Sequence, residues 1–284
     1  MSPLSVAVIV LNYRGEQVLP RCLASLELAI GPQDRVLIVD NGHEETLMAA
    51  MRSRYPWVEV IRTEANGGFA AGMNFGIRQM LEHGEFDAFW LLNNDASVAP
   101  DALGQLKQAL TECGGRALFS PAIITTEQQT PWFAGGRIDF FRMRTKHEQS
   151  FISEHTPYET GFLTGCALFI PREAMASIGL LDERYFLYYE DAAYSLQAAR
   201  AGLKLWVIPE ARVSHSEESR ENPTKTYWLV RSGVEFFLRE SRGLWWLWVR
   251  CVLVLRQLKN WVEVRYRPRP VADEVKRAYT DVSL

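Results

Sequence analysis

Four short polar motifs carry the side chains of this 284-residue chain that could do chemistry. In the first, residues 91–96 read LLNNDA, so an apolar run ends in two amides and a carboxylate. Divalent cations such as Mg²⁺ are held by one or two carboxylates plus substrate phosphates, and Asp95 could be such a ligand. Asn93 or Asn94 could hydrogen-bond a ribose or a phosphate. The same residue types are common in turns that follow strands, so both interpretations stay open here.

The second motif is glycine-rich: residues 66–76 read NGGFAAGMNFG. Glycines ahead of a helix allow the backbone to approach a ligand closely, and the free N–H groups at a helix start can bind an anion. The spacing differs from the G-x-G-x-x-G of dinucleotide sites. Because Gly72 and Gly76 lie one helical turn apart, tight helix packing is the alternative interpretation.

The third and fourth motifs offer a base and a second metal ligand. Residues 188–194 read YYEDAAY, so two adjacent acids open a helix. Asp191 could be its N-cap, or a catalytic base whose ionised form is favoured by the helix start. His215 ends an extended segment. A lone His is more often a hydrogen-bonded structural group, but a cation at Asp95 needs further ligands.

The elements that must position these side chains alternate between strand and helix. Continuous apolar runs predict strands buried on both faces, and the alternation predicts a mostly parallel, doubly wound α/β sheet. Ligands bind beyond the carboxyl ends of such strands, where Asn12, Asp40 and Asn93 lie. We expect strands at 6–11, 36–39, 58–61 and 86–92, and helices at 17–28, 44–55 and 69–82.

The pattern changes beyond about residue 115, where strand and helix signals no longer alternate. An aromatic and basic stretch predicts either a hairpin or a loop, at residues 131–153. Pro171 stands at the first position of a short predicted helix. We expect strands at 117–124 and 161–170, an extended segment at 206–213 and helices at 171–178, 191–201, 224–240 and 244–264.

Composition excludes several classes of protein. The net charge is −3 and the sequence pI about 6.0, which gives no basis for nucleic-acid binding. Four widely spaced cysteines predict neither a zinc site nor a disulfide framework and favour a reducing, cytoplasmic compartment. The first ten residues lack a basic segment and continue into a strand pattern, so we do not interpret them as a signal peptide.

Taken together, the motifs resemble the rhamnosyltransferase-like branch of family 2 glycosyltransferases, over roughly residues 4–240. The resemblance implies a GT-A fold, with a nucleotide-binding half at about 1–115, an acceptor-binding half at about 116–240 and a helical extension at 241–284. The matching strings are residues 9–13, 38–41, 66–76, 91–95, 161–169, 181–183 and 186–202, together with His215.

The resemblance also implies roles for individual residues. Asp40 matches a carboxylate that contacts the nucleotide base or ribose, and Asn94 and Asp95 match an Asp-x-Asp-like metal motif. Asp191 stands at the catalytic base, and His215 matches a residue that helps hold the metal or diphosphate. The rest of the nucleotide-sugar wall comprises Asn12, Asn66, Gly68, Asn74 and Asn93, and the acceptor-side candidates are Gly165, Tyr189 and Glu190.

Three positions depart from the family pattern. Amides replace acids in the metal motif, which predicts weak cation binding until the donor diphosphate arrives. Gly42 and His43 replace the small hydroxyl residue that usually follows Asp40 and Asn41, which leaves open which nucleotide base the donor carries. Glu217 and Glu218 follow His215 where glycine is more usual, and they either adjust the metal site or are merely solvated.

These features predict an inverting glycosyltransferase that depends on Mg²⁺ or Mn²⁺ and uses a nucleoside-diphosphate sugar. The predicted acceptor is a glycan or lipid-linked glycan of cell-surface polysaccharide synthesis, and the nearest look-alikes often use dTDP-rhamnose as donor. A sugar-phosphate nucleotidyltransferase would need a basic glycine-rich loop after the first strand, which residues 11–16 (LNYRGE) do not supply. A non-catalytic nucleotide-sugar-binding subunit of the same fold is a further alternative.

The C-terminal segment 244–269 is rich in Trp and in basic residues. Its uninterrupted apolar stretch is far shorter than the ~20 residues of a membrane-spanning helix. The composition suits an interfacial helix at the inner face of the cell membrane, with residues 265–269 attracted to anionic lipid. Packing on the catalytic domain, or on a second copy in a homodimer, is the alternative.

Overall fold

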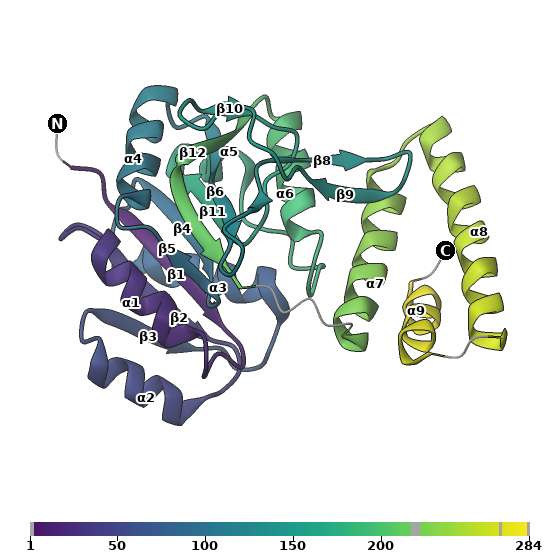
Figure 1. Ribbon diagram of the computed structural model, residues 1–284, viewed down its shortest axis with the longest axis horizontal. Coiled ribbons are helices and arrows are strands. Elements are labelled where there is room, and N and C mark those ends of the chain that lie inside the picture. Colours follow the sequence, from purple (N-terminus) through teal and green to yellow (C-terminus); the bar gives the residue numbers. More distant parts are fainter. Residues whose placement is uncertain (1–2, 217–221, 267–268, 283–284) are drawn as a thin grey trace.

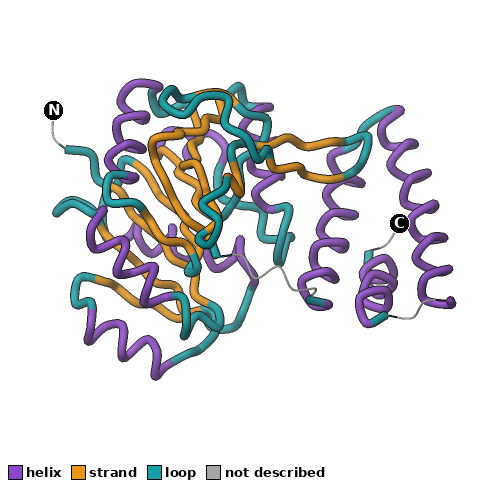
Figure 2. The backbone as a smooth tube through the Cα atoms, viewed as in Figure 1, coloured by secondary structure: helices purple, strands orange, loops and turns teal. Residues whose placement is uncertain are grey.

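The apolar runs of the chain assemble into one twisted sheet, which Figures 1 and 2 show at the centre of the larger lobe. The computed structural model describes residues 3–216, 222–266 and 269–282. The strand order is β10 (Tyr158–Glu159), β12 (Lys204–His215), β6 (Ala117–Thr125), β11 (Ala167–Pro171), β4 (Ala88–Asn93), β1 (Val6–Asn12), β2 (Arg35–Asp40) and β3 (Val58–Arg62), with β5 (Ala96–Val98) on β12 and β7 (Pro131–Phe133) on β6.

The sheet is mixed but mostly parallel, as the alternating pattern predicts. Strands β1, β2, β3 and β4 run parallel to one another, and β6 runs parallel to β12. Strand β11 is inserted antiparallel between β4 and β6, where it joins the two parallel groups. The central strands are buried along their length, which accounts for their continuous apolar sequence.

Helices cover both faces of this sheet (Figure 1). The glycine-rich motif begins one of them, and its Gly72 and Gly76 face Leu11 and Ile9 of β1, so the packing interpretation of these two glycines is confirmed. The helices are α1 (Leu19–Ala29), α2 (Glu45–Arg54), α3 (Gly68–His83), α4 (Ala102–Cys113), α5 (Arg172–Ile178), α6 (Glu190–Arg200), α7 (Pro223–Glu240), α8 (Leu244–Tyr266) and α9 (Pro270–Asp281).

Several local predictions were wrong. Residues 161–166 are not a strand, because the chain crosses the end of the sheet there before β11 begins. Pro171 is the N-cap residue of α5, one position before the first helical residue, Arg172. The hairpin alternative for the stretch 131–153 is confirmed: it contains the antiparallel pair β8 (Gly136–Asp139) and β9 (Arg144–His147), and β7 precedes them. Helices α4 and α9 were not predicted.

The C-terminal helices form a second group beside the sheet lobe (Figure 1). Tyr227 of α7 donates a hydrogen bond of 2.7 Å to Asp281 of α9, and Asn260 of α8 donates one of 3.0 Å to the Ala272 carbonyl of α9. Among the described helices, none combines the length and hydropathy that crossing a bilayer requires.

The close approach of α3 to the sheet is testable with two Gly→Ala substitutions. A Cβ at Gly76 would lie 2.7 Å from Ile9 and 2.8 Å from Val39. We therefore expect Gly76→Ala to lower the free energy of unfolding by about 1–3 kcal/mol, measured by urea titration. A Cβ at Gly104 of α4 would meet nothing within 4 Å, so Gly104→Ala is expected to raise it by about 0.5–1 kcal/mol. Equal effects at the two sites would contradict this account.

Candidate functional site

A cavity of about 400 Å³ lies where the two halves of the sheet meet. Strands β1 and β4 end here in register, with Leu11 opposite Asn93, and the 161–166 segment crosses the same edge. Of the predicted site residues, seven line this cavity: Asn93, Asp95, Gly165, Tyr189, Glu190, Asp191 and His215. Six others lie outside its lining: Asn12, Asp40, Asn66, Gly68, Asn74 and Asn94.

Asp95 and His215 face each other across one wall of the cavity. Oδ2 of Asp95 lies 3.2 Å from Nε2 of His215. The backbone fixes this approach, because β12 pairs antiparallel with β5 and sets His215 opposite Ala96. The ring of Trp132 packs against the imidazole, with centroids 4.7 Å apart. Two groups from distant parts of the sequence therefore converge on one point.

The donor set at this point fits a divalent cation. Oδ1 of Asp95 is buried and has no hydrogen-bond partner among the described residues, and the same holds for Nδ1 of His215. The described residues contain no cluster of three or more His, Cys, Asp or Glu side chains placed to hold a metal. A cation on Asp95 and His215 would thus keep positions for substrate phosphates, as Mg²⁺ usually does. Glu217 and Glu218 lie outside the described residues.

The amides of the metal motif are tied to the first strand. Asn94 donates a hydrogen bond of 2.9 Å to the Asn12 side-chain oxygen, and Asn12 donates one of 2.8 Å to Glu44. The N–H of Gly15 also donates to Glu44, at 3.2 Å. Glu44 was missed in the sequence, since only the fold brings it to Asn12. These bonds hold the turn that carries Asp95 against β1.

Asp40 lines a separate, smaller cavity of about 250 Å³ together with Arg52 and Arg62. Its fully buried carboxylate accepts hydrogen bonds from the Glu44 N–H at 3.0 Å and from Nε of Arg62 at 3.3 Å. Asp40 thus ends β2, as predicted, and its carboxylate already has hydrogen-bond partners within the protein.

The first turn of the glycine-rich motif contacts Phe186, in the segment that precedes α6. A Cβ at Gly68 would lie 2.0 Å from the Phe186 carbonyl oxygen, and the N–H of Phe69 donates to that oxygen at 2.8 Å. Asn66 accepts the Gly68 N–H at 2.9 Å and so closes the turn before α3. Gly68 thus allows the close approach of the segment that leads into α6.

Asn74, predicted as part of the nucleotide wall, is buried between α3 and the same segment. Its amide donates to the Leu181 carbonyl and to Glu183, both at 2.9 Å, and its oxygen accepts the Leu181 N–H at 3.1 Å. These three bonds use both N–H groups of the amide and one of the two acceptor positions of its oxygen. We therefore propose that Asn74 positions the chain ahead of α6 rather than contacting the nucleotide.

Asp191 enters the cavity from the first turn of α6. It is not the N-cap, because Tyr189 precedes the helix in a left-handed conformation with φ of 68°. Its carboxylate accepts the N–H of Gly165 at 2.9 Å and of Ala192 at 2.8 Å. Burial raises the pKa of Asp191 to about 6, outweighing the two backbone hydrogen bonds, which lower it. The backbone N–H groups thus favour the ionised form, as the sequence predicts, but burial has the larger effect on the pKa.

Glu190 is the second acid of the pair and is fully buried. Burial first, and then the charge of Asp191, raises the pKa of Glu190 well above its usual value. Its Oε2 has no hydrogen-bond partner among the described residues. Of the two acids, Glu190 is therefore the one that burial and its neighbour's charge shift toward the protonated form.

Two successive tyrosines in the left-handed region, Tyr188 and Tyr189, both with φ of 68°, turn the chain into α6. Such residues cost about 1–3 kcal/mol each and persist only where packing fixes them. The Tyr189 ring packs against Phe236 and Phe237 of α7, where a Cβ at Gly233 would lie 2.9 Å from it. Helix α7 therefore stabilises the backbone that aims Asp191.

Four further lining residues were not predicted. The β9 strand supplies Thr145 and His147, and α7 supplies Lys225 and Leu229. They come from segments whose sequences carry no motif, and only the fold places them beside Asp191. The hairpin and α7 thus complete the lining of the cavity.

Residues 3–231 match the family model described as glycosyltransferase like family 2. The chain belongs to this family. It is an enzyme that transfers glycosyl groups, which decides against the nucleotidyltransferase and non-catalytic alternatives.

Two curated relatives carry rhamnosyltransferase names. The N-acetylglucosaminyl-diphospho-decaprenol L-rhamnosyltransferase of Mycobacterium tuberculosis is 27% identical to this glycosyltransferase over 84% of this chain and 85% of that protein. The dTDP-rhamnosyl transferase RfbF of Shigella flexneri is 21% identical over 69% and 68% of the two chains.

Solved structures confirm the GT-A fold. GalNAc-T7, solved with UDP, GalNAc and Mn²⁺, matches with a TM-score of 0.68 and 18% identity over 99% of this glycosyltransferase, which spans only 54% of that chain. Residues 1–349 of TarS from S. aureus, solved with UDP-GlcNAc, match with a TM-score of 0.60 and 14% identity, over 98% of this chain and 80% of that one.

The role of Asn74 is testable by Asn74→Ala. Loss of its hydrogen bonds leaves the buried Leu181 N–H and carbonyl unpaired, so we expect the free energy of unfolding to fall by about 1–3 kcal/mol. The dissociation constant for a nucleoside diphosphate, measured by calorimetry on the folded variant, is expected to stay unchanged. Weaker nucleotide binding without loss of stability would instead return Asn74 to the nucleotide wall.

Proposed function

We propose that this glycosyltransferase is an inverting, metal-dependent enzyme that transfers rhamnose from dTDP-rhamnose to a lipid-linked glycan of cell-surface polysaccharide synthesis. The observation that carries the proposal is one cavity lined by Asp95 and His215 on one wall and by Asp191 on another. The names of the mycobacterial and Shigella relatives support the sugar, its nucleotide and the type of acceptor.

Asp191 is the proposed base. Attack on the anomeric carbon requires the acceptor hydroxyl to lose its proton, and an ionised carboxylate in the cavity can take it. A base with a pKa of about 6 is mostly ionised at neutral pH yet remains a stronger proton acceptor than an ordinary carboxylate. Attack opposite the leaving group inverts the anomeric centre in one step, so no nucleophilic Ser or Cys is needed.

Asp95 and His215 are the proposed protein ligands of Mg²⁺ or Mn²⁺. Their converging atoms, 3.2 Å apart, support this assignment, as does the Mn²⁺ with which the structurally similar GalNAc-T7 was solved. The chemistry that a bound cation would supply is neutralisation of the negative charge that develops on the departing diphosphate. The bonds of Asn94 and Asn12 keep the Asp95 turn in place for this task.

The base assignment is tested by Asp191→Asn. Asn keeps an oxygen for the Gly165 N–H but cannot take a proton, so we expect the transfer rate to fall about 10²–10⁴-fold with donor affinity nearly unchanged. Asp101→Asn, an exposed substitution at α4, is the matched control. In the parent enzyme kcat/KM for the acceptor should fall tenfold per pH unit below about pH 6, because Asp191 is then protonated. A turnover of Asp191→Asn close to the parent's would exclude the assignment.

The metal assignment is tested by Asp95→Asn, which removes the carboxylate charge beside His215 with little change in shape. We expect Mn²⁺ and dTDP, titrated together by calorimetry, to bind about tenfold more weakly or worse. Chelation by EDTA should abolish transfer by the parent enzyme, and added Mn²⁺ should restore it. Unchanged joint affinity in the variant would place the cation elsewhere.

A further inference from the structure

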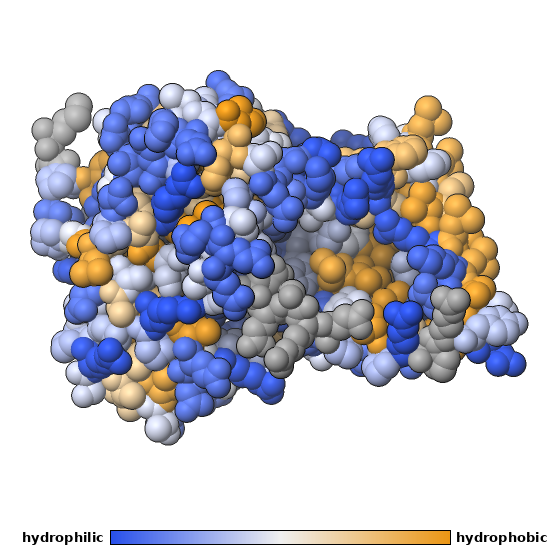
Figure 3. Space-filling view, in the orientation of Figure 1, coloured by the Kyte–Doolittle hydropathy of each residue, from blue (hydrophilic) through white to orange (hydrophobic). Residues whose placement is uncertain are grey.

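The outward face of α8 is apolar along nearly its whole length (Figure 3, right). Most of its side chains are three, four or seven residues apart, and Val254 and Leu255 are adjacent, so all of them lie on one side of the helix. Leu244 is 84% exposed, Leu255 65% and Leu258 57%. We call this face the outer stripe, and it consists of Leu244, Leu247, Val254, Leu255, Leu258 and Val262. An exposed apolar face of this kind marks an interaction surface.

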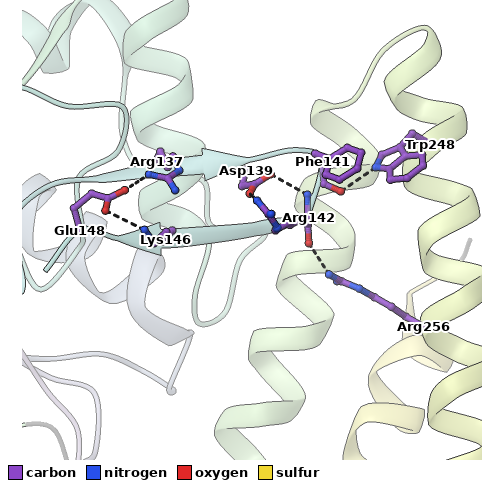
Figure 4. Close-up of polar contacts among 8 residues, drawn as sticks. All are labelled: Arg137, Asp139, Phe141, Arg142, Lys146, Glu148, Trp248 and Arg256. Carbon is purple, nitrogen blue, oxygen red and sulfur yellow. Dashed lines mark hydrogen bonds and ion pairs between the residues drawn. The ribbon is translucent and has the colours of Figure 1, made fainter.

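The opposite face of α8 is already occupied. Val249 and Leu253 are fully buried, and the helix is fastened to the tip of the β8–β9 hairpin (Figure 4). The ring of Trp248 stacks on Phe141 at 4.8 Å and donates a hydrogen bond of 2.9 Å to the Phe141 carbonyl. Arg256 donates one of 2.6 Å to the Arg142 carbonyl. The inner contacts thus hold α8 in place and leave the outer stripe without a partner among the described residues of this chain.

Basic residues flank the outer stripe. Arg250, Lys259 and Arg265 are exposed on α8 beside it. Residues 241–284 carry nine Lys and Arg against four Asp and Glu, whereas the whole chain has a net charge of −3. Positive charge is therefore concentrated on the part of the molecule that carries the apolar face. Exposed Trp245 and Trp261 add the aromatic side chains typical of membrane interfaces.

We propose that the outer stripe docks on the surface of an anionic phospholipid bilayer, with α8 lying in the headgroup region. The apolar side chains enter the acyl boundary and the flanking cations face lipid phosphates. Pairing of the stripe with a second copy of the chain would instead place two basic rims, each with Arg250, Lys259 and Arg265, beside one another. Like charges at the edge of such an interface disfavour it, so the charge pattern favours lipid over a homodimer.

Docking also fixes the cavity relative to the membrane. The hairpin that binds α8 at its tip supplies Thr145 and His147 to the cavity at its other end. A helix held on lipid therefore keeps this side of the cavity at a set distance from the bilayer. The docking itself does not depend on which sugar or acceptor the enzyme uses.

The experiment is flotation with vesicles of equal parts phosphatidylglycerol and phosphatidylcholine, compared with phosphatidylcholine alone. We expect the parent enzyme to float with the anionic vesicles and mostly to remain below with the neutral ones. Leu255→Asp with Leu258→Asp should lower partitioning at least tenfold, because each leucine loses its apolar burial. Leu28→Asp is the matched control, since Leu28 is 70% exposed on α1. Arg250→Glu with Arg265→Glu should weaken binding about fivefold per cation removed.

Thermal unfolding verifies that each variant is folded, and light scattering gives the mass of the parent and of the Leu255/Leu258 variant. Three results would overturn the proposal. One is a parent enzyme that fails to float. Another is a Leu255/Leu258 variant that floats as well as the Leu28 control. The third is a parent dimer that the same leucine substitutions convert to a monomer while neither protein binds vesicles, since the occupant of the stripe is then a second copy.

Discussion

The backbone hydrogen bonds of β4 fix where the two halves of the molecule meet. On one side β4 pairs parallel with β1, and on the other it pairs antiparallel with β11. The N–H of Asn93 donates to the Cys166 carbonyl at 2.9 Å just as the strand ends. Trp90, fully buried, fills the centre of the same strand. The chain leaving β4 therefore emerges where the two groups of strands meet, and Asp95 lies two residues beyond the end of the strand.

The two acids of the cavity differ in electrostatic environment, and this difference gives them different chemistry. Asp95 faces an imidazole and keeps one oxygen without a hydrogen-bond partner among the described residues, which suits a cation. Asp191 is surrounded by protein, receives two backbone N–H groups and has a raised pKa, which suits a proton. Burial, and after it the charge of Asp191, raises the pKa of Glu190 well above its usual value. Burial and partners separate the roles of chemically identical carboxylates.

Much of the fold could be predicted because its signals are local. Continuous apolar runs predicted the parallel strands, and the polar residues that end them, Asn12, Asp40 and Asn93, do lie at one edge of the sheet. Leu103, Leu106 and Leu110 of α4 have helical spacing, so that helix was within reach of the same reasoning.

What could not be predicted depends on partners distant in sequence. Gly68 and Asn74 also contact residues within 181–186, more than a hundred positions away, and no signal near either residue predicts these contacts. The left-handed turn at Tyr188 and Tyr189 contains no glycine from which it could be predicted. It is stabilised by the packing of α7 on the ring of Tyr189. The share of the cavity built by the hairpin is likewise a product of tertiary structure.

The contacts between the tip of the β8–β9 hairpin and α8 can form only after a delay during synthesis of the chain. Trp248 leaves the ribosome 107 residues after Phe141, and Arg256 follows Arg142 by 114. At about 5–20 residues per second, the hairpin waits about 5–20 s for its partner. Over that interval the sheet can close around β4 while the hairpin tip still lacks its contacts with α8. Those contacts therefore form only when α8 emerges, late in the synthesis of the chain.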